Sequence, residues 1–340
     1  MKAIVINAPG DIVVKEIDRP QPAPGEVLLR MQYVGFCGSD LSTYQGKNPM
    51  VNYPRIPGHE ISGRIAGLGE EVPEGYVIDD AVTVVPYTNC GSCPSCRRGR
   101  SHACRENQTL GVQRDGAMQE YLTVPWQKIL PAPKLNDLEL AMVEPLTVGF
   151  HAIRRGRVEE SDVVMVLGCG MIGAGAIAGA ALRGATVIAV DIDDHKLKLA
   201  ALLGAQHTIN SVTSDLHTEL EGLTGGDGPD VMVEAAGNPL TYRAAVDEVA
   251  FTGRVVCIGY AGSEVSFATK LFVQKEIDIM GSRNATPDDF RDVISYLEKV
   301  TFPQDRMITG KVKAEDASRR VEQWAADPGK VMKILVDFNS

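Results

Sequence analysis

The sequence predicts an α/β protein with two domains, one mainly β and barrel-like and the other built on a doubly wound parallel sheet. With 340 residues the chain is long for a single hydrophobic core, which favours two domains. Short strand-like runs separated by Pro and Gly clusters fill residues 1–145 and indicate antiparallel strands. Strand-like and helical stretches then alternate, as in a parallel sheet with crossover helices.

The elements follow this division in chain order. In the first part we expect strands at 3–6, 26–35, 61–69 and 81–86. In the second part we expect strands at 163–168, 186–191, 207–210, 231–237 and 254–260, with helices at 172–183, 196–203 and 240–249. The tail predicts helices at 288–300 and 314–326 and a last strand at 330–338. Because that strand has no place in a completed sheet, we expect domains of 1–147 with 287–340, and of 148–286.

The composition and the net charge limit the kinds of molecule that the chain is expected to bind. The net charge of −10 argues against nucleic acid and anionic membranes, which both select basic surfaces. Segment 163–182 is long enough to cross a bilayer, but its five glycines and β-branched start favour a strand followed by a helix. The first residues lack the apolar length of a secretory signal, so we expect a cytoplasmic protein without membrane or nucleic-acid partners.

A cluster of four cysteines is the most informative motif. The segment NCGSCPSCRRGRSHAC contains Cys90, Cys93, Cys96 and Cys104. Two C-x-x-C steps and a fourth thiol can close a tetrahedral zinc site within one loop, and such clustering favours metal-bound thiolates in a reducing cytosol. A zinc ion with four protein ligands has no open position, so we expect a structural site.

A glycine-rich turn joins a predicted strand to a predicted helix. The segment VVMVLGCGMIGAGA contains Gly168, Gly170 and Gly173 in the spacing G-x-G-x-x-G, with Met171 and Ile172 inside the turn. These glycines allow a tight turn, close backbone approach to a pyrophosphate and helix–strand packing, while the helix N-terminus favours the anion. The segment therefore predicts a dinucleotide-binding (Rossmann) domain.

Asp191 ends the next predicted strand, 18 residues after Gly173. A carboxylate at that place accepts hydrogen bonds from the ribose hydroxyls and repels a 2′-phosphate, which predicts NAD rather than NADP. The alternative is that Asp191 only terminates its strand.

Three further fragments contain residues of the kinds that bind metals. They are GFCGSD with Cys37, IPGHE with His59 and Glu60, and MVEP with Glu144. Each alone has a simpler explanation, as a core thiol, a surface pair or a helix-end charge. Their coexistence with the cysteine loop and the nucleotide motif makes a second metal site the better interpretation.

Taken together, the chain resembles the zinc-dependent medium-chain alcohol dehydrogenases over essentially its whole length. The matching segments, in the family's order, are GFCGSD, PGHE, the cysteine loop, LGVQRDGAMQEY, EPLTVGFHA and GCGMIG. The resemblance implies a GroES-like catalytic domain beside the Rossmann domain, two zinc ions per chain, NAD, and a homodimer or homotetramer.

The resemblance also implies roles for the metal-type residues. Cys37, His59 and Glu144 would surround a catalytic zinc, with Glu60 as an exchangeable fourth ligand. Alcohol dehydrogenases proper carry a Cys where this chain has Glu144, so the Glu is similar to the polyol, threonine and sugar-acid branch. Zinc with an open position is a Lewis acid that would favour hydride transfer from a substrate alcohol to NAD.

The proton relay departs from the family pattern. Ser39 matches the Ser or Thr that begins the relay, whereas Ser42 stands where many members have a His. We expect Ser39 to be catalytic and leave the exit of the relay open. Asp40 is expected to order this loop or to support His59.

The resemblance places further residues near the nicotinamide half of the cofactor. They are Ala236, Gly259, Tyr260 and Arg283. A structural role for Arg283, paired with a backbone carbonyl, is the alternative.

The stretch TYQGKNPMVNYPRIPGHE is similar to the galactonate and gulonate 5-dehydrogenases. We therefore expect oxidation of a secondary alcohol of a sugar acid or polyol, with Arg55, Arg114 or Arg283 available for a substrate carboxylate. A threonine 3-dehydrogenase-like or sorbitol dehydrogenase-like enzyme is the nearest alternative. A non-catalytic regulator that senses NAD or a sugar acid is the alternative from another class, and the complete ligand set disfavours it.

Overall fold

The computed structural model describes residues 1–339, which form two compact units. One unit contains Met1–Glu144 and the C-terminal residues from Phe290 on, and the other contains Pro145–Asp289. The predicted α/β class, with a β-rich domain and a parallel-sheet domain, is confirmed.

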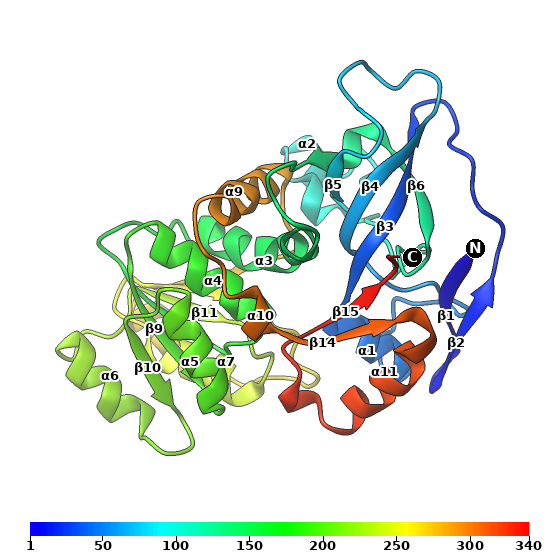
Figure 1. Cartoon of the computed structure of the whole chain (residues 1–340). Coiled ribbons are helices and arrows are strands. Elements are labelled where there is room, and N and C mark those ends of the chain that lie inside the picture. Colours follow the sequence, from blue (N-terminus) through cyan, green and yellow to red (C-terminus); the bar gives the residue numbers. More distant parts are fainter. Residues whose placement is uncertain (340) are drawn as a thin grey trace. The chain divides into compact units, whose positions relative to one another are not determined.

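The first unit is organised around a seven-stranded sheet. Its strands are β3 (Glu26–Phe36), β4 (Glu60–Leu68), β5 (Ala81–Val84), β6 (Tyr121–Pro125), β7 (Ile129–Pro131), β14 (Ile308–Lys313) and β15 (Lys333–Asp337). The long strand β3 pairs with β4 on one side, and on the other with β6 along its first half and with β15 along its second half. Figure 1 shows β15, in red, alongside β3.

The remaining elements of this unit are short. A hairpin is formed by β1 (Lys2–Ala8) and β2 (Asp11–Glu16), and the helices are α1 (Gly38–Tyr44), α2 (Pro94–Arg97), α10 (Gln304–Met307) and α11 (Ala317–Ala326). Buried residues of β3, β4 and β15, among them Leu29, Ile61 and Ile334, form one core with Trp324 of α11. Two more helices, α3 (Asp137–Arg155) and α9 (Pro287–Leu297), run from one unit into the other.

The second unit is a six-stranded parallel sheet in the order β10-β9-β8-β11-β12-β13. Its strands are β8 (Val163–Leu167), β9 (Thr186–Asp191), β10 (His207–Asn210), β11 (Val231–Glu234), β12 (Arg254–Cys257) and β13 (Asp278–Gly281). Its helices are α4 (Met171–Leu182), α5 (Asp194–Leu202), α6 (Leu216–Thr224), α7 (Pro239–Glu248) and α8 (Lys270–Gln274). The strand order reverses between β8 and β11, so ligands are expected outside the carboxyl ends of these two strands.

The predicted strands of this sheet are present, with two differences. The strands at 231–237 and 254–260 end three residues early, because apolar residues continue into the turns that follow them. The edge strand β13 has no counterpart among the predicted strands. No helix within residues 1–339 has the length and apolar character needed to span a membrane.

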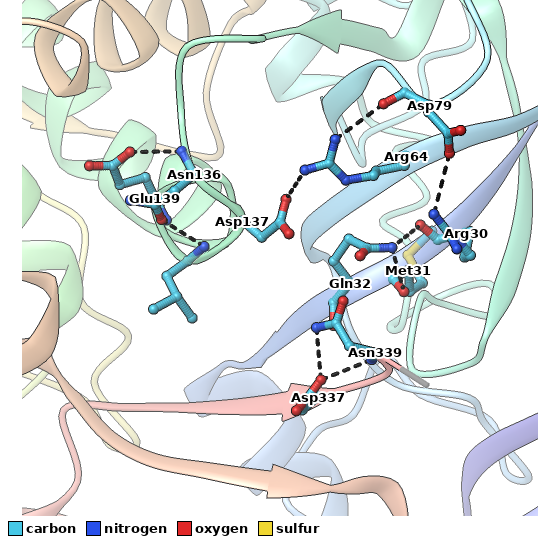
Figure 2. A network of polar contacts seen from close by, with 11 residues as sticks. Arg30, Met31, Gln32, Arg64, Asp79, Asn136, Asp137, Glu139, Asp337 and Asn339 are labelled. Carbon is cyan, nitrogen blue, oxygen red and sulfur yellow. Dashed lines mark hydrogen bonds and ion pairs between the residues drawn. The ribbon is translucent and has the colours of Figure 1, made fainter.

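Polar side chains fasten the ends of α3 and β15 to the sheet (Figure 2). Nη2 of Arg64 on β4 lies 2.8 Å from Oδ1 of Asp137, the first residue of α3. After β15, the side-chain amide of Asn339 donates to the carbonyl of Gln32 on β3 at 3.3 Å. These contacts fix two elements that carry candidate functional residues.

Helices α3 and α4 pack backbone to backbone at two glycines. A Cβ added to Gly149 would lie 2.1 Å from the nitrogen of Ala176, and one added to Gly175 would lie 2.4 Å from the oxygen of Leu146. Both contacts would be with backbone atoms, so the overlap cannot be relieved by the movement of a flexible side chain.

Gly149→Ala is therefore expected to destabilise the protein by about 1–3 kcal/mol, as overpacking does. The urea midpoint, followed by circular dichroism, measures the loss. Gly222→Ala is the matched control, because that helical glycine has nothing within 4 Å of an added Cβ. A variant at 149 as stable as the control would contradict the packing argument.

Candidate functional site

The cysteine loop brings four sulfur atoms together. The Sγ atoms of Cys90, Cys93, Cys96 and Cys104 all lie within 4.8 Å of one another. Cys93 Sγ lies 3.5 Å from Cys96 Sγ and 3.8 Å from Cys104 Sγ. Zn–S bonds of about 2.3 Å give a tetrahedron with edges of about 3.8 Å, so the spacing fits one zinc ion.

Backbone N–H groups stabilise these sulfurs. The N–H of Cys90 donates to Cys104 Sγ, and that of Cys93 donates to Cys90 Sγ, each at 3.3 Å. Hydrogen bonds from the backbone of Arg105 and Cys96 lower the pKa of Cys93 to about 6, which favours the thiolate that a metal needs.

A second group of metal-type side chains lies at the ends of β3 and β4. Cys37, His59 and Glu60 offer ligand atoms that all lie within 4.8 Å of one another. Cys37 follows β3 and precedes α1, while Glu60 begins β4 and pairs with Gly35 in the register of the two strands. The pairing of β3 with β4 therefore brings Cys37, His59 and Glu60 together.

Two atoms here are buried without hydrogen-bond partners among the described residues. They are Nδ1 of His59 and Oγ of Ser39. Burial alone would lower the pKa of His59, but the adjacent Cys37, Glu144 and Asp40 raise it well above its usual value. Buried polar atoms are normally satisfied, so these two indicate a ligand, and sulfur, nitrogen and oxygen donors together fit zinc.

Glu60 lies in a buried ion pair with Lys333, the first residue of β15. Nζ of Lys333 lies 2.5 Å from both Oε1 and Oε2 of Glu60 and donates to the carbonyl of Phe36 at 3.1 Å. The side chains are only 1% and 3% exposed. Gly35 makes the space, because a Cβ there would lie 1.9 Å from Oε2 of Glu60.

Glu144, in α3, has a different partner. The hydroxyl of Tyr87 donates to Oε1 of Glu144 at 2.5 Å, and both residues are buried. Burial raises the pKa of Glu144, although the charge of His59 opposes the shift. Within residues 1–339 the 4.8 Å group contains Glu60 and not Glu144, so the role of Glu144 as a ligand stays a prediction.

Asp40 orders the loop between these segments, as expected from the sequence. Its Oδ2 accepts the N–H of Cys37 at 2.9 Å and its Oδ1 accepts that of Gly58 at 3.4 Å. One buried carboxylate therefore holds the chain on both sides of the second metal-type group.

The glycine-rich turn between β8 and α4 has the geometry expected of a phosphate site. Gly168 has φ +95°, and a Cβ on Gly173 would lie 1.8 Å from the oxygen of Gly168. Gly170 precedes α4, and among the described residues no side chain caps its N-terminus, where Met171 and Ile172 begin the first turn. The backbone N–H groups there can meet an anion.

Asp191 lies at the end of β9 and contacts the same turn. Its Oδ2 accepts the N–H of Cys169 at 2.7 Å, and its Oδ1 accepts those of Ile192 and Asp193 at 2.8 and 3.0 Å. A carboxylate can accept about four hydrogen bonds, so capacity for a ribose hydroxyl remains. Its contact with the ribose stays a prediction.

The other predicted cofactor residues lie at the carboxyl ends of β11, β12 and β13. Ala236 follows β11, Gly259 and the exposed Tyr260 follow β12, and the half-buried Arg283 follows β13. Sequence reasoning missed Glu234, whose Oε1 accepts the N–H groups of Ala236 and Gly237 at 3.1 and 2.8 Å. It shapes the turn that carries Ala236.

One of the arginines available for a substrate carboxylate is used elsewhere. Nη1 of Arg55 lies 2.9 Å from Oδ1 of Asp115, and the side chain is 13% exposed, so Arg55 has a structural partner. Sequence reasoning also missed Lys128, whose Nζ donates to the carbonyl of Tyr87 at 2.6 Å. Burial and the nearby Arg114 lower the pKa of Lys128.

Two known protein families match the chain, one in each half. The family described as "Alcohol dehydrogenase GroES-like domain" matches residues 23–134, and "Zinc-binding dehydrogenase" matches residues 172–299.

Two characterised relatives align over nearly the whole chain. L-galactonate-5-dehydrogenase of Escherichia coli strain K12 is 32% identical over 338 residues, which cover 99% of each protein. Sorbitol dehydrogenase of Halalkalibacterium halodurans is 32% identical over 344 residues, again covering 99% of each.

Two solved structures have the same fold over nearly the whole chain. An alcohol dehydrogenase (rspB) from E. coli CFT073, complexed with NADH, has a TM-score of 0.90 at 29% identity and covers 99% of each chain. A zinc-binding dehydrogenase from Sinorhizobium meliloti, bound to NADP, has a TM-score of 0.89 at 28% identity and covers 99% and 98%.

We predict two zinc ions per chain by elemental analysis, each removable separately. Cys93→Ser is expected to leave one ion and lower thermal stability, because the cysteine loop loses its cross-link. His59→Ala is expected to leave one ion with little loss of stability. Equal loss of both ions in either variant would contradict two independent sites.

Proposed function

The chain belongs to the zinc-type alcohol dehydrogenase family, in its polyol and sugar-acid group. From that premise we propose that its substrate is a secondary alcohol of a sugar acid, such as a hexonate, or of a polyol, and that its cofactor is NAD. The group of half-buried Cys37 with buried His59 and Glu60, near Glu144, carries the proposal. Zinc bound there by Cys37, His59 and Glu144 would supply a Lewis acid for the substrate hydroxyl.

The protein's own residues perform the remaining tasks. The N–H groups at the start of α4 bind the diphosphate, and Asp191 orients the ribose. Ser39 takes the proton of the substrate hydroxyl, which gives its buried Oγ a partner. The turn shaped by Glu234 positions the nicotinamide half.

The choice of a sugar acid is supported by charge near Tyr87. Lys128 contacts its carbonyl, Arg114 is close enough to lower the pKa of Lys128, and the Tyr87 hydroxyl reaches Glu144. Lys128 and Arg114 are the cations that we propose for a substrate carboxylate. L-threonine, which needs a partner for its ammonium as well, is the second candidate.

A homodimer or homotetramer is part of the proposal. Strand β13 is the edge of the parallel sheet, and the nearby Val273 and Ile279 are 83% and 45% exposed. An edge strand with exposed apolar side chains favours pairing with a second copy of the chain.

A screen of hexonates, polyols and L-threonine with NAD and with NADP tests substrate and cofactor together. We expect NADH from a hexonate or polyol, and little NADPH. Asp191→Ser is expected to raise the ratio of NADP to NAD activity by at least about 10-fold, because the charge that repels a 2′-phosphate is removed. Asp194→Ser, at a neighbouring acid, is the control and should leave the ratio unchanged.

Ser39→Ala is expected to lower kcat by about 100-fold near neutral pH, the usual size of a lost proton-transfer group. The loss should shrink at high pH, where the hydroxyl deprotonates without help. Ser42→Ala, three residues further on, should keep nearly full activity. Equal effects of the two substitutions would remove Ser39 from the relay.

A further inference from the structure

Glu234, the last residue of β11, is an acidic side chain with no exposed surface. Its Oε1 accepts hydrogen bonds from the N–H groups of Ala236 and Gly237 and from the hydroxyl of Thr241, at 3.1, 2.8 and 2.7 Å. All three donors are neutral, and within residues 1–339 Oε2 has no hydrogen-bond partner. A carboxylate is therefore buried here without a contacting cation, which is a costly arrangement.

The hydrogen bonds of this turn do not require a negative charge. A glutamine at position 234 would offer a neutral carbonyl oxygen that can accept the same three bonds. Glutamate is almost never fully buried unless it is paired with a cation. The charge of Glu234 therefore needs an explanation beyond the shape of the turn.

The charge lies directly behind the turn that follows β12. A Cβ added to Gly259 would lie 2.6 Å from Oε2 of Glu234 and 2.3 Å from the nitrogen of Gly237, so the turns after β11 and β12 pack against each other. Gly259 and Cys257 both line a cavity of about 530 Å³ in the second unit. Burial raises the pKa of Cys257 to about 11, and the charge of Glu234 adds to the shift. The negative potential of Glu234 thus reaches the wall of a space that a ligand can enter.

The proposed cofactor passes over these turns, so this inference rests on the proposed function. With one ribose at Asp191 on β9 and the diphosphate at the start of α4, after β8, the nicotinamide half extends over β11 and β12, the next strands of the sheet. The nicotinamide ring carries a positive charge in NAD⁺ and none in NADH. We propose that Glu234 is a specificity-determining residue whose charge favours binding of NAD⁺ and release of NADH.

The test measures the dissociation constants of NAD⁺ and NADH by calorimetry on the full-length, zinc-loaded protein. Glu234→Gln keeps the hydrogen-bond acceptor and removes the charge, so Kd for NAD⁺ should rise at least about 5-fold while Kd for NADH changes less than about 2-fold. Thr241→Val keeps the charge and removes one hydrogen bond, so the ratio of the two constants should stay within about 2-fold of the wild-type ratio. Glu219→Gln, at an exposed acid of α6, is the control for net charge and should change neither constant.

A merely structural role of Glu234 would change both dissociation constants by the same factor, and an unchanged ratio in Glu234→Gln would overturn the inference. If circular dichroism shows that Glu234→Gln does not fold, Thr241→Lys decides. Its ammonium can pair with Oε1 of Glu234 and should raise the ratio of Kd for NAD⁺ to Kd for NADH at least about 3-fold. An unchanged ratio in that variant would contradict the inference equally. A wild-type protein that binds neither NAD⁺ nor NADH would refute the proposed function instead.

Discussion

The buried pair of Glu60 and Lys333 is the contact on which the first unit's arrangement most depends. It joins residues 273 positions apart in the sequence, and it lies where β15, β3 and β4 meet. Removing one partner of such a pair typically costs about 3–5 kcal/mol, because a charge is left buried.

Other contacts support the elements that carry the site. Arg64 on β4 holds the start of α3 through Asp137, and Gln32 on β3 holds the end of β15 through Asn339 (Figure 2). They hold the start of α3, which carries Glu144, and the end of β15, which carries Lys333. Functional side chains are held in productive geometry by such supporting contacts.

The fold class and the local motifs could be predicted because each depends on neighbours in sequence. Four cysteines in one loop, or three glycines in one turn, lie close together in space because they lie close together in the sequence. Lys333, Tyr87 and Glu234 could not be found in this way. Each is one residue in an ordinary strand or loop pattern, and its partner becomes evident only from the fold.

The basic residues also show that the sequence alone does not identify the partner of a side chain. Arg55 has the right charge for a substrate carboxylate, but Asp115, sixty residues later, pairs with it. Lys128 had no sequence signal, and its contact with the carbonyl of Tyr87 is evident only from the fold. Residue type suggests what a side chain can bind, whereas the fold decides which partner it meets.

The two candidate zinc sites differ in how they are built. The cysteine loop supplies four like donors and its own N–H groups within one segment, so it closes around an ion without help from the sheet. The second group is assembled from the segment that follows β3 and from the start of β4, and its carboxylate, Glu60, pairs with Lys333 of β15. Three donors from separate segments can leave a position for substrate at a metal ion, whereas four thiolates in one loop leave none.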